Sequence, residues 1–334
     1  MSGLVTDGLF DLQVNGYAGV DFNDEGLTAE ALDHALEAML AAGVTQCLPT
    51  IITAFPDELC ARFKALDTAV AASRLGPAMV PGYHLEGPFL NDGEGYRGCH
   101  PHRAMGDPDT ALVDRIETGL ARPILLVSLA PERDGSTAFA EAMRARGKAL
   151  AIAHSAAGYA AVRAAADAGV SLSTHLGNGL PQQLPKLENP LLAQLAEPRL
   201  AACVIADGHH MSPDAVAALV RLKGTDNTIL VTDAVVAAAT PPGSYRFAGI
   251  EVQHTPEGAV VQPGRRNLAG SALRLDVAVR NVVEWGIADA PTAIAMASDH
   301  PRRALADAMA RLCAAQPVRG VAWSDELVPA VLPA

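Results

Sequence analysis

Residues 79–91, MVPGYHLEGPFLN, contain a short apolar run that leads directly into the carboxylate of Glu86. Two later apolar runs, ALAIA and VSLST, end in the same way at His154 and His175, and the run TILVT leads to Asp233. Polar side chains at the carboxyl ends of strands are typical of the site in a parallel barrel. If these runs are neighbouring strands, one acid and two histidines converge on a point where they can bind a metal ion.

Short apolar runs alternate with Ala-rich segments of helical spacing along most of the chain. The predicted strands are Phe10–Val14, Val44–Thr50, Met79–Leu85, Ile124–Leu129, Ala149–Ala153, Val170–Thr174, Ala201–Ile205 and Thr228–Thr232. Predicted helices between them include Thr28–Ala42, Pro56–Ser73, Thr137–Arg146, Tyr159–Ala168 and Pro213–Leu222. Thr28 and Ser212 have the character of N-caps, whereas Gly43, Gly147 and Gly169 have the character of helix stops.

This alternation indicates parallel strands joined by helical crossovers, and its length suits an α/β fold of the (β/α)8 TIM barrel type. A doubly wound open sheet is the alternative, but its polar residues should gather at one switch point rather than at most strand ends. We therefore predict a barrel over residues 1–312, with a small β insertion near 244–265. Residues 313–334 form a short tail with one or two strands.

The bulk properties exclude several classes of function. The 334 residues carry a net charge of −12 without long runs of one sign, which argues against nucleic acid or an anionic membrane as the partner. The five cysteines are scattered without metal-binding or redox spacing, which is typical of a reducing compartment. No signal peptide and no membrane span is visible. We expect a cytoplasmic protein.

The predicted ligands define the chemistry of the site. One carboxylate and two imidazoles, from Glu86, His154 and His175, suit Zn²⁺, with Fe²⁺ and Mn²⁺ as alternatives. A metal lowers the pKa of bound water, and Asp233 is placed to move that water's proton. Strand 1 ends at Gln13 and Asn15, which are poor ligands for a transition metal. We therefore predict one metal rather than two. A role for Gln13 and Asn15 as hydrogen-bonding residues alone fits the sequence equally well.

A single histidine at a strand end is more often a hydrogen-bonded core residue than a ligand, but four polar residues at four strand ends favour a site. The stretch Gly93–Gly98 matches the dinucleotide-binding pattern GxGxxG. It neither follows a strand directly nor opens a helix, so a loop over the pocket is the better interpretation.

At the level of motifs, the chain resembles the N-acetylglucosamine-6-phosphate deacetylase family of the amidohydrolase superfamily. Roughly residues 10–310 are covered by the resemblance. The motifs, in order, are DLQVNGYAGVDFND (11–24), HLEGPFLN (84–91), AHS (153–155), THLGNGL (174–180), ADGHH (206–210), VTDA (231–234) and LAGSAL (268–273). Together the motifs are specific, whereas any one of them alone is weak. The resemblance implies a metal-dependent barrel hydrolase, usually a homodimer, that acts on the N-acetyl amide of a sugar phosphate.

The resemblance also implies roles for individual residues. Glu86, His154 and His175 match the metal ligands, Asp233 matches the catalytic acid/base, and His100 matches a histidine that polarises the acetyl carbonyl. Residues that match substrate contacts are Asn178, Gly179, His210, Leu268, Ala269, Gly270 and Ser271. Gln13 and Asn15 occupy the place of a second metal's histidines in related barrel hydrolases.

Three departures from the family pattern stand out. Lys186 occupies the position of a phosphate-binding arginine, and a lysine cannot form the bidentate fork. Gly179 stands where the family usually has alanine. The chain begins almost at strand 1 and its tail is short, so we expect the family's accessory β-sandwich to be reduced or absent.

These observations predict hydrolysis of the N-acetyl amide of an amino sugar, with N-acetylglucosamine 6-phosphate as the expected substrate and glucosamine 6-phosphate and acetate as products. One alternative is a deacylase of an unphosphorylated or different N-acyl amino compound. Another, from a different class, is a sugar-binding barrel without catalysis.

Overall fold

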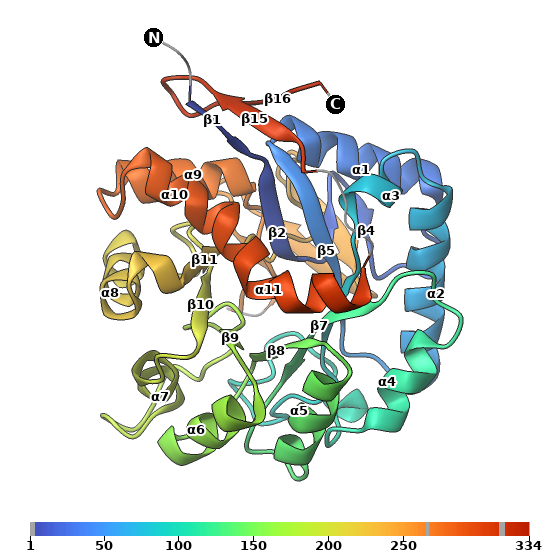
Figure 1. Ribbon diagram of the computed structural model, residues 1–334, viewed down its shortest axis with the longest axis vertical. Helices are drawn as coiled ribbons and strands as arrows, with labels where there is room; N and C mark the ends of the chain where they lie inside the picture. Colours follow the sequence, from blue (N-terminus) through green and yellow to red (C-terminus); the bar gives the residue numbers. More distant parts are fainter. Residues whose placement is uncertain (1–3, 265–266, 314–317, 334) are drawn as a thin grey trace.

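The computed structural model describes residues 4–264, 267–313 and 318–333. Its centre is a parallel eight-stranded sheet in the order β11-β10-β9-β8-β7-β6-β5-β2. The strands are β2 (Leu9–Val14), β5 (Val44–Ile52), β6 (Tyr83–Glu86), β7 (Ile124–Leu129), β8 (Ala149–Ile152), β9 (Leu172–Ser173), β10 (Ala201–Val204) and β11 (Thr228–Leu230). Figure 1 looks along this nearly closed barrel, which confirms the predicted (β/α)8 fold.

The seam between β2 and β11 closes through single contacts rather than a continuous ladder. Val14 and Ala234 form a parallel bridge, and the amide of Asp233 donates to the carbonyl of Gln13 at 2.9 Å. The hydroxyl of Thr232 donates to Asp11 Oδ2 at 2.5 Å. Burial raises the pKa of Asp11 to about 7, although its hydrogen bonds to Thr232 and Gln13 oppose the shift. The seam thus fixes Asp233 against the first barrel strand.

Helices surround the barrel, as the crossovers of parallel strands require. They are α1 (Ala29–Ala41), α2 (Pro56–Ala72), α3 (Gly76–Met79), α4 (Thr110–Glu117), α5 (Ser136–Ala145), α6 (Tyr159–Ala168), α7 (Pro190–Ala196), α8 (Pro213–Lys223), α9 (Leu275–Glu284), α10 (Ala290–Ala297) and α11 (Asp299–Leu312), with 3₁₀ turns η1 (His102–Ala104) and η2 (Thr225–Asn227). The predicted caps are confirmed: Thr28 Oγ1 accepts from Ala31 N, and Ser212 Oγ accepts from Ala215 N, both at 3.2 Å. Gly169 ends α6 with a φ of 106°.

The third barrel strand is shorter at its start than the sequence predicts. The prediction began it at Met79, but Met79 ends the short helix α3, and β6 begins only at Tyr83. Pro81 lies between them and has no amide hydrogen for a sheet ladder, which explains the late start. The end of the strand at Glu86, which matters for the site, is unchanged by this correction.

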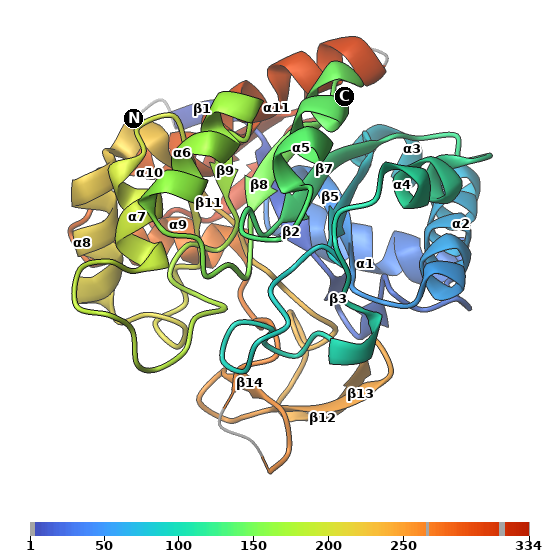
Figure 2. The ribbon, with the colours of Figure 1, turned by 90° about the horizontal axis from the view of Figure 1, so that it is seen from below.

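A small antiparallel sheet follows β11, as predicted. It consists of β12 (Gly243–Phe247), β13 (Ile250–His254) and β14 (Val260–Val261). The hairpin β3 (Gly16–Tyr17) and β4 (Val20–Asp21) lies near it, because the amide of Ala248 donates to Asp21 Oδ2 at 2.7 Å. Figure 2 shows this insertion at one end of the barrel and α11 at the other. The last residue of the predicted insertion, 265, lies outside the described residues.

The tail pairs with the start of the chain. Strands β1 (Leu4–Asp7), β15 (Gly320–Trp323) and β16 (Pro329–Val331) form a three-stranded sheet at the edge of the barrel (Figure 1). Trp323 Nε1 donates to Thr6 Oγ1 at 2.9 Å. The expected boundary at residue 312 therefore leaves β1 on the barrel side although it pairs with the tail. Tail residues 314–317 and 334 lie outside the described part of the chain.

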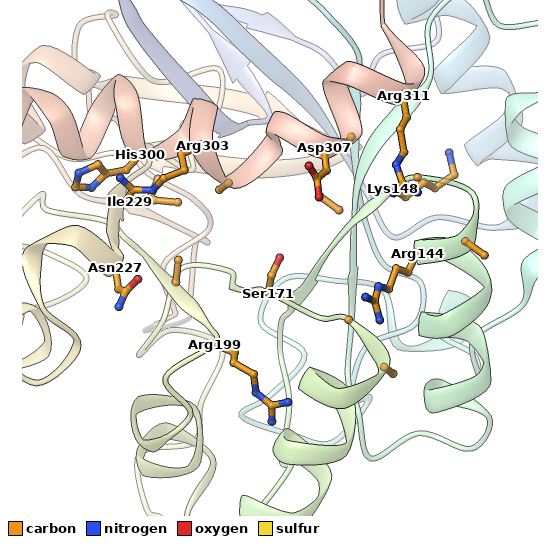
Figure 3. Close-up of a pocket in the computed structure, with 18 of the residues that line it drawn as sticks. Arg144, Lys148, Ser171, Arg199, Asn227, Ile229, His300, Arg303, Asp307 and Arg311 are labelled. Atoms are coloured by element: carbon orange, nitrogen blue, oxygen red, sulfur yellow. The ribbon is translucent and has the colours of Figure 1, made fainter.

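A cleft of about 710 Å³ opens at the amino-terminal ends of β8 to β11, beside α11 (Figure 3). Its charged lining residues include Arg144, Arg199, Arg303, Asp307 and Arg311. Acids accompany these cations: Arg199, for example, binds Glu197 at 2.7 Å and Asp167 at 2.6 Å. Barrels of this type carry their chemistry at the opposite, carboxyl-terminal face, so we assign this cleft no catalytic role.

Candidate metal centre

The four predicted strand-end residues meet at the carboxyl-terminal face of the barrel. Glu86 ends β6, and His154, His175 and Asp233 follow β8, β9 and β11 within three residues. All four line one cavity of about 460 Å³. Glu86, His154 and His175 are only 2%, 9% and 3% exposed, whereas Asp233 is partly open to the cavity. The structure thus brings these four side chains together at one end of the barrel.

Three of these residues have an unusual backbone. The φ angles of His154, His175 and Asp233 are 45°, 29° and 48°, in the left-handed region that side chains other than glycine rarely adopt. Each residue lies where a strand turns sharply into its loop, and the turn directs its side chain toward the cavity. Backbone strain of this kind costs of order 1–3 kcal/mol per residue and is concentrated at functional sites.

The donor atoms of Glu86, His154 and His175 all lie within 4.8 Å of one another. His175 Nε2 is 2.9 Å from Glu86 Oε1, and His154 Nε2 is 3.6 Å from the same oxygen. Burial alone would raise the pKa of Glu86, but the contacts with His154 and His175 hold it well below its ordinary value. A buried carboxylate and two imidazole nitrogens that share one small volume fit a divalent transition metal.

His154 is held by backbone groups on both sides. Its Nδ1 is 2.6 Å from the carbonyl oxygen of Tyr96, so Nε2 is the nitrogen that faces Glu86. A Cβ at Gly179 would lie 2.5 Å from His154 Nδ1, and one at Gly98 would lie 3.2 Å from its Cε1. Glycine at position 179 therefore lets the loop after β9 approach the imidazole ring.

Two side-chain amides, one from Gln13 in strand β2 and one from Asn15 just after it, hold Asp233 and Glu86 in place. Gln13 Nε2 donates to Glu86 Oε2 at 3.0 Å and to Asp233 Oδ1 at 3.1 Å, and Asn15 Nδ2 donates to the same Oδ1 at 2.7 Å. Burial and the charge of Glu86 raise the pKa of Asp233 to about 6, against the opposing effects of His175, His210 and Asn15. Both amides are thus hydrogen-bond donors to carboxylates.

We expect Gln13→Leu to weaken metal binding by about 10- to 100-fold, because partners that orient a ligand typically have effects of this size. The measurement is the metal dissociation constant, obtained by competition with a chelator. Gln46→Leu is the matched control, since Gln46 is a buried glutamine on the neighbouring strand β5 whose amide has no partner among the described residues. Equal dissociation constants for the two variants would contradict this role for Gln13.

His100 lies beside the triad. Its ring centroid is 4.6 Å from that of His154, and its Nδ1 is 2.8 Å from the hydroxyl oxygen of Thr53. Burial and the neighbouring His154 lower the pKa of His100 to about 3, although Glu86 opposes the shift. A neutral imidazole with one N–H can donate a hydrogen bond to a carbonyl oxygen without carrying a charge.

The other predicted contact residues divide into three groups. Asn178, Gly179, His210, Leu268 and Gly270 line the cavity. Ala269 and Ser271 are buried behind it, where Ser271 Oγ donates to the carbonyl of Thr232 at 2.6 Å. Lys186 is exposed and is not among the residues that line the cavity, so its phosphate contact stays a prediction. The loop that carries Lys186 directs this side chain into solvent.

Gly95 and Gly98 line the cavity, in agreement with the interpretation of Gly93–Gly98 as a loop over the pocket. Several lining residues had no individual role predicted from the sequence. They are Ile52, Gly95, Gly98, Cys99, Gly177, Leu180, Pro181, Gln182, His209, Val235, Phe247 and Asn267. His209 could have been found from its place in the loop after β10, where barrel sites draw their residues. Phe247 has no such signal, because the insertion brings it to the cavity from a different sheet. No lysine or arginine lines the cavity within the described ranges 4–264, 267–313 and 318–333.

A (β/α)8 barrel with a buried Glu-His-His cluster and a neighbouring aspartate at its carboxyl-terminal face defines a metal-dependent hydrolase of the amidohydrolase type.

No protein-family model matches the chain. Curated relatives do match. An N-acetylgalactosamine-6-phosphate deacetylase of Escherichia coli O157:H7 is 34% identical, over 90% of this chain and 78% of its own length. The N-acetylglucosamine-6-phosphate deacetylase of Vibrio furnissii is 31% identical, over 89% of this chain and 73% of its own length. The chain belongs to this family of amino-sugar-6-phosphate deacetylases, within the amidohydrolase superfamily.

Solved structures of deacetylases in this family have the same fold as this chain. A mutant N-acetyl-D-glucosamine-6-phosphate deacetylase from Mycobacterium smegmatis, in complex with N-acetyl-D-glucosamine-6-phosphate, has a TM-score of 0.86 at 27% identity and covers 99% of this chain and 85% of its own. The N-acetylglucosamine-6-phosphate deacetylase of Pasteurella multocida has a TM-score of 0.85 at 24% identity. It covers 98% of this chain and 85% of its own, and this similarity supports the fold. The sequence resemblance to the family is thereby confirmed.

Proposed function

We propose that the protein hydrolyses the N-acetyl amide of an N-acetylhexosamine 6-phosphate, with N-acetylglucosamine 6-phosphate as the first candidate substrate. The observation that carries the proposal is the convergence of Glu86, His154, His175 and Asp233 on one cavity in a chain of this family. The matching relatives include one named for N-acetylgalactosamine 6-phosphate and one named for N-acetylglucosamine 6-phosphate. The test therefore includes both sugars, which differ in configuration at C4.

Glu86, His154 and His175 would hold one divalent metal, with Zn²⁺ as the proposed ion and Fe²⁺ or Mn²⁺ as alternatives. Such an ion polarises a carbonyl oxygen and lowers the pKa of a water molecule toward about 7. A single metal is supported by Gln13 and Asn15, whose amides donate to carboxylates where a second metal would need ligands.

Asp233 is the proposed proton carrier. Gln13 and Asn15 both donate to its Oδ1, so we assign the proton transfer to Oδ2. Asp233 accepts a proton from the attacking water as the new C–O bond forms at the acetyl carbon. It then gives that proton to the sugar nitrogen as the C–N bond breaks, which leaves acetate and the amine. His100 donates a hydrogen bond to the acetyl oxygen, where negative charge develops.

A second candidate substrate is the same amino sugar without phosphate. The exposed position of Lys186 favours it, because phosphate is usually bound by lysine or arginine.

The test compares kcat/KM for N-acetylglucosamine 6-phosphate, N-acetylgalactosamine 6-phosphate and the two unphosphorylated sugars, with acetate release as the assay. We expect the better phosphorylated sugar to exceed its unphosphorylated form by about 100-fold or more, since a charged contact of about 3 kcal/mol corresponds to that factor. Equal values would support the second candidate. No hydrolysis of any of the four by metal-loaded protein would refute the proposed function.

We further propose that the protein acts in the cytoplasm as a homodimer. Family resemblance supports the dimer, and the scattered cysteines support a reducing compartment. Within the described residues, no helix is long and apolar enough to cross a membrane.

A further inference from the structure

One side of the cavity is apolar. We call the five residues Ile52, Cys99, Val235, Phe247 and Leu268 the apolar wall; all of them line the cavity. Ile52, Val235 and Phe247 belong to a small hydrophobic cluster that is separate from the main barrel core, and Cys99 packs against it. The insertion β12–β14, at the carboxyl-terminal end of the barrel in Figure 2, supplies much of this cluster. An apolar surface that faces a reaction cavity is a binding site for an apolar part of the substrate.

The apolar wall lies directly beside the reacting groups. Cys99 precedes His100 in the chain, and Val235 follows Asp233 by two residues. Ile52 pairs with Glu86 in the register of β5 and β6. Each of these three wall residues is thus a chain or strand neighbour of a residue that would act on the amide. A group bound to the amide carbon must therefore lie close to the apolar wall.

The apolar wall is held in place from both sides. The amide of Ile52 donates to Asn23 Oδ1 at 2.9 Å. Phe247 is 2% exposed, and the amide of the next residue is bound by Asp21, which ties the β12–β13 turn to the barrel. A Cβ at Gly270 would lie 2.4 Å from Val235 Cγ1, so the turn before Ser271 packs tightly against this valine.

Polar groups also line the cavity. They are Asn178, Gln182, His209, His210 and Asn267, and they come from the loops after β9, β10 and β14. His210 is fixed there by Asp207, whose Oδ2 is 2.6 Å from its Nδ1. Sugar hydroxyls need hydrogen-bond partners, whereas an acyl methyl group needs none. The two parts of the substrate therefore match the two kinds of lining.

We propose that the apolar wall is the acyl subsite: it receives the methyl group of the acetyl substituent and limits the length of acyl chain that the enzyme accepts. This inference rests on the proposed function and adds its acyl selectivity. Because the wall is tightly packed, a longer chain cannot be accommodated by a shift of Phe247 or Val235. The ligand class is a short N-acyl group, and acetyl is the one that fits.

The experiment measures kcat/KM for N-acetyl, N-propionyl and N-butyryl forms of whichever sugar wild-type protein hydrolyses. Phe247→Ala and Ile52→Ala enlarge the subsite, and each should raise the propionyl-to-acetyl ratio by about 10-fold or more, the usual effect of one methylene in an apolar pocket. Cys99→Ala is a milder third variant, with a side chain that is only partly buried. Val252→Ala is the matched control, because Val252 is buried in the same cluster but does not line the cavity.

A ratio that stays within twofold of wild type in all folded wall variants would overturn the inference, as would an equal rise in Val252→Ala. These results differ from failure of the proposed function, in which wild-type protein releases no acetate at all. If both Phe247→Ala and Ile52→Ala fail to fold, the propionyl-to-acetyl ratio of Cys99→Ala tests the inference. Wild-type protein that hydrolyses the butyryl and acetyl forms equally well would overturn the inference without any variant.

Discussion

Asp233→Asn is expected to lower kcat by about 10³-fold or more while the protein still binds its metal, because the variant loses the acid/base group but keeps the shape of the side chain. The amide oxygen of the substituted side chain can still accept the hydrogen bonds of Gln13 and Asn15, so the seam between β2 and β11 should survive. Acetate release and metal content, measured on the same preparation, test this expectation.

Asp67→Asn is the matched control for this prediction. Asp67 is buried on α2, where it accepts from the hydroxyl of Tyr83 at 2.7 Å and from the amide of Ala121 at 2.7 Å, away from the cavity. This variant should change thermal stability rather than kcat. If Asp233→Asn turned over substrate within tenfold of wild type, Asp233 would not be the proton carrier.

Glu86→Gln should have a comparable or larger effect, through loss of the metal. The substitution removes the single carboxylate from the triad and leaves the two imidazoles. A unit charge about 4 Å from its partner is worth about 4 kcal/mol at an effective dielectric constant of about 20, which is roughly 10³-fold in affinity. We therefore expect metal content far below that of wild type after dialysis, and kcat/KM reduced in proportion.

The matched control for Glu86→Gln is Glu117→Gln. Glu117 also forms an ion pair away from bulk solvent, with Lys148 Nζ at 2.6 Å, but it lies on α4 outside the cavity. Its variant should lose stability and keep its metal. A Glu86→Gln protein with normal metal content and normal activity would exclude Glu86 as a ligand.

The barrel could be predicted because its signal is local: each strand is a short apolar run, and each helix has its own spacing and cap. Strand β1 could not be predicted from a local pattern, because residues 4–7 form a strand only by pairing with β15 at the other end of the chain. The start of β6 was misplaced because the apolar residues Met79 and Val80 do not show that Pro81 interrupts the ladder.

In the site, the strand-end position of Glu86, His154, His175 and Asp233 predicted their convergence, since parallel strands all present their carboxyl ends at one face. The loop residues were less predictable. Lys186 matched a family motif, but its loop leaves it in solvent. The β insertion that contains Phe247 was predicted, but no local pattern reports that the insertion brings this side chain to the cavity.

The most direct test of the single-metal centre is a titration of metal-stripped protein with Zn²⁺, in which acetate release is followed at each addition. The triad of Glu86, His154 and His175 predicts no activity without metal and a linear rise that stops at one equivalent per chain. Activity in the stripped protein, or a rise that continues to two equivalents, would contradict it.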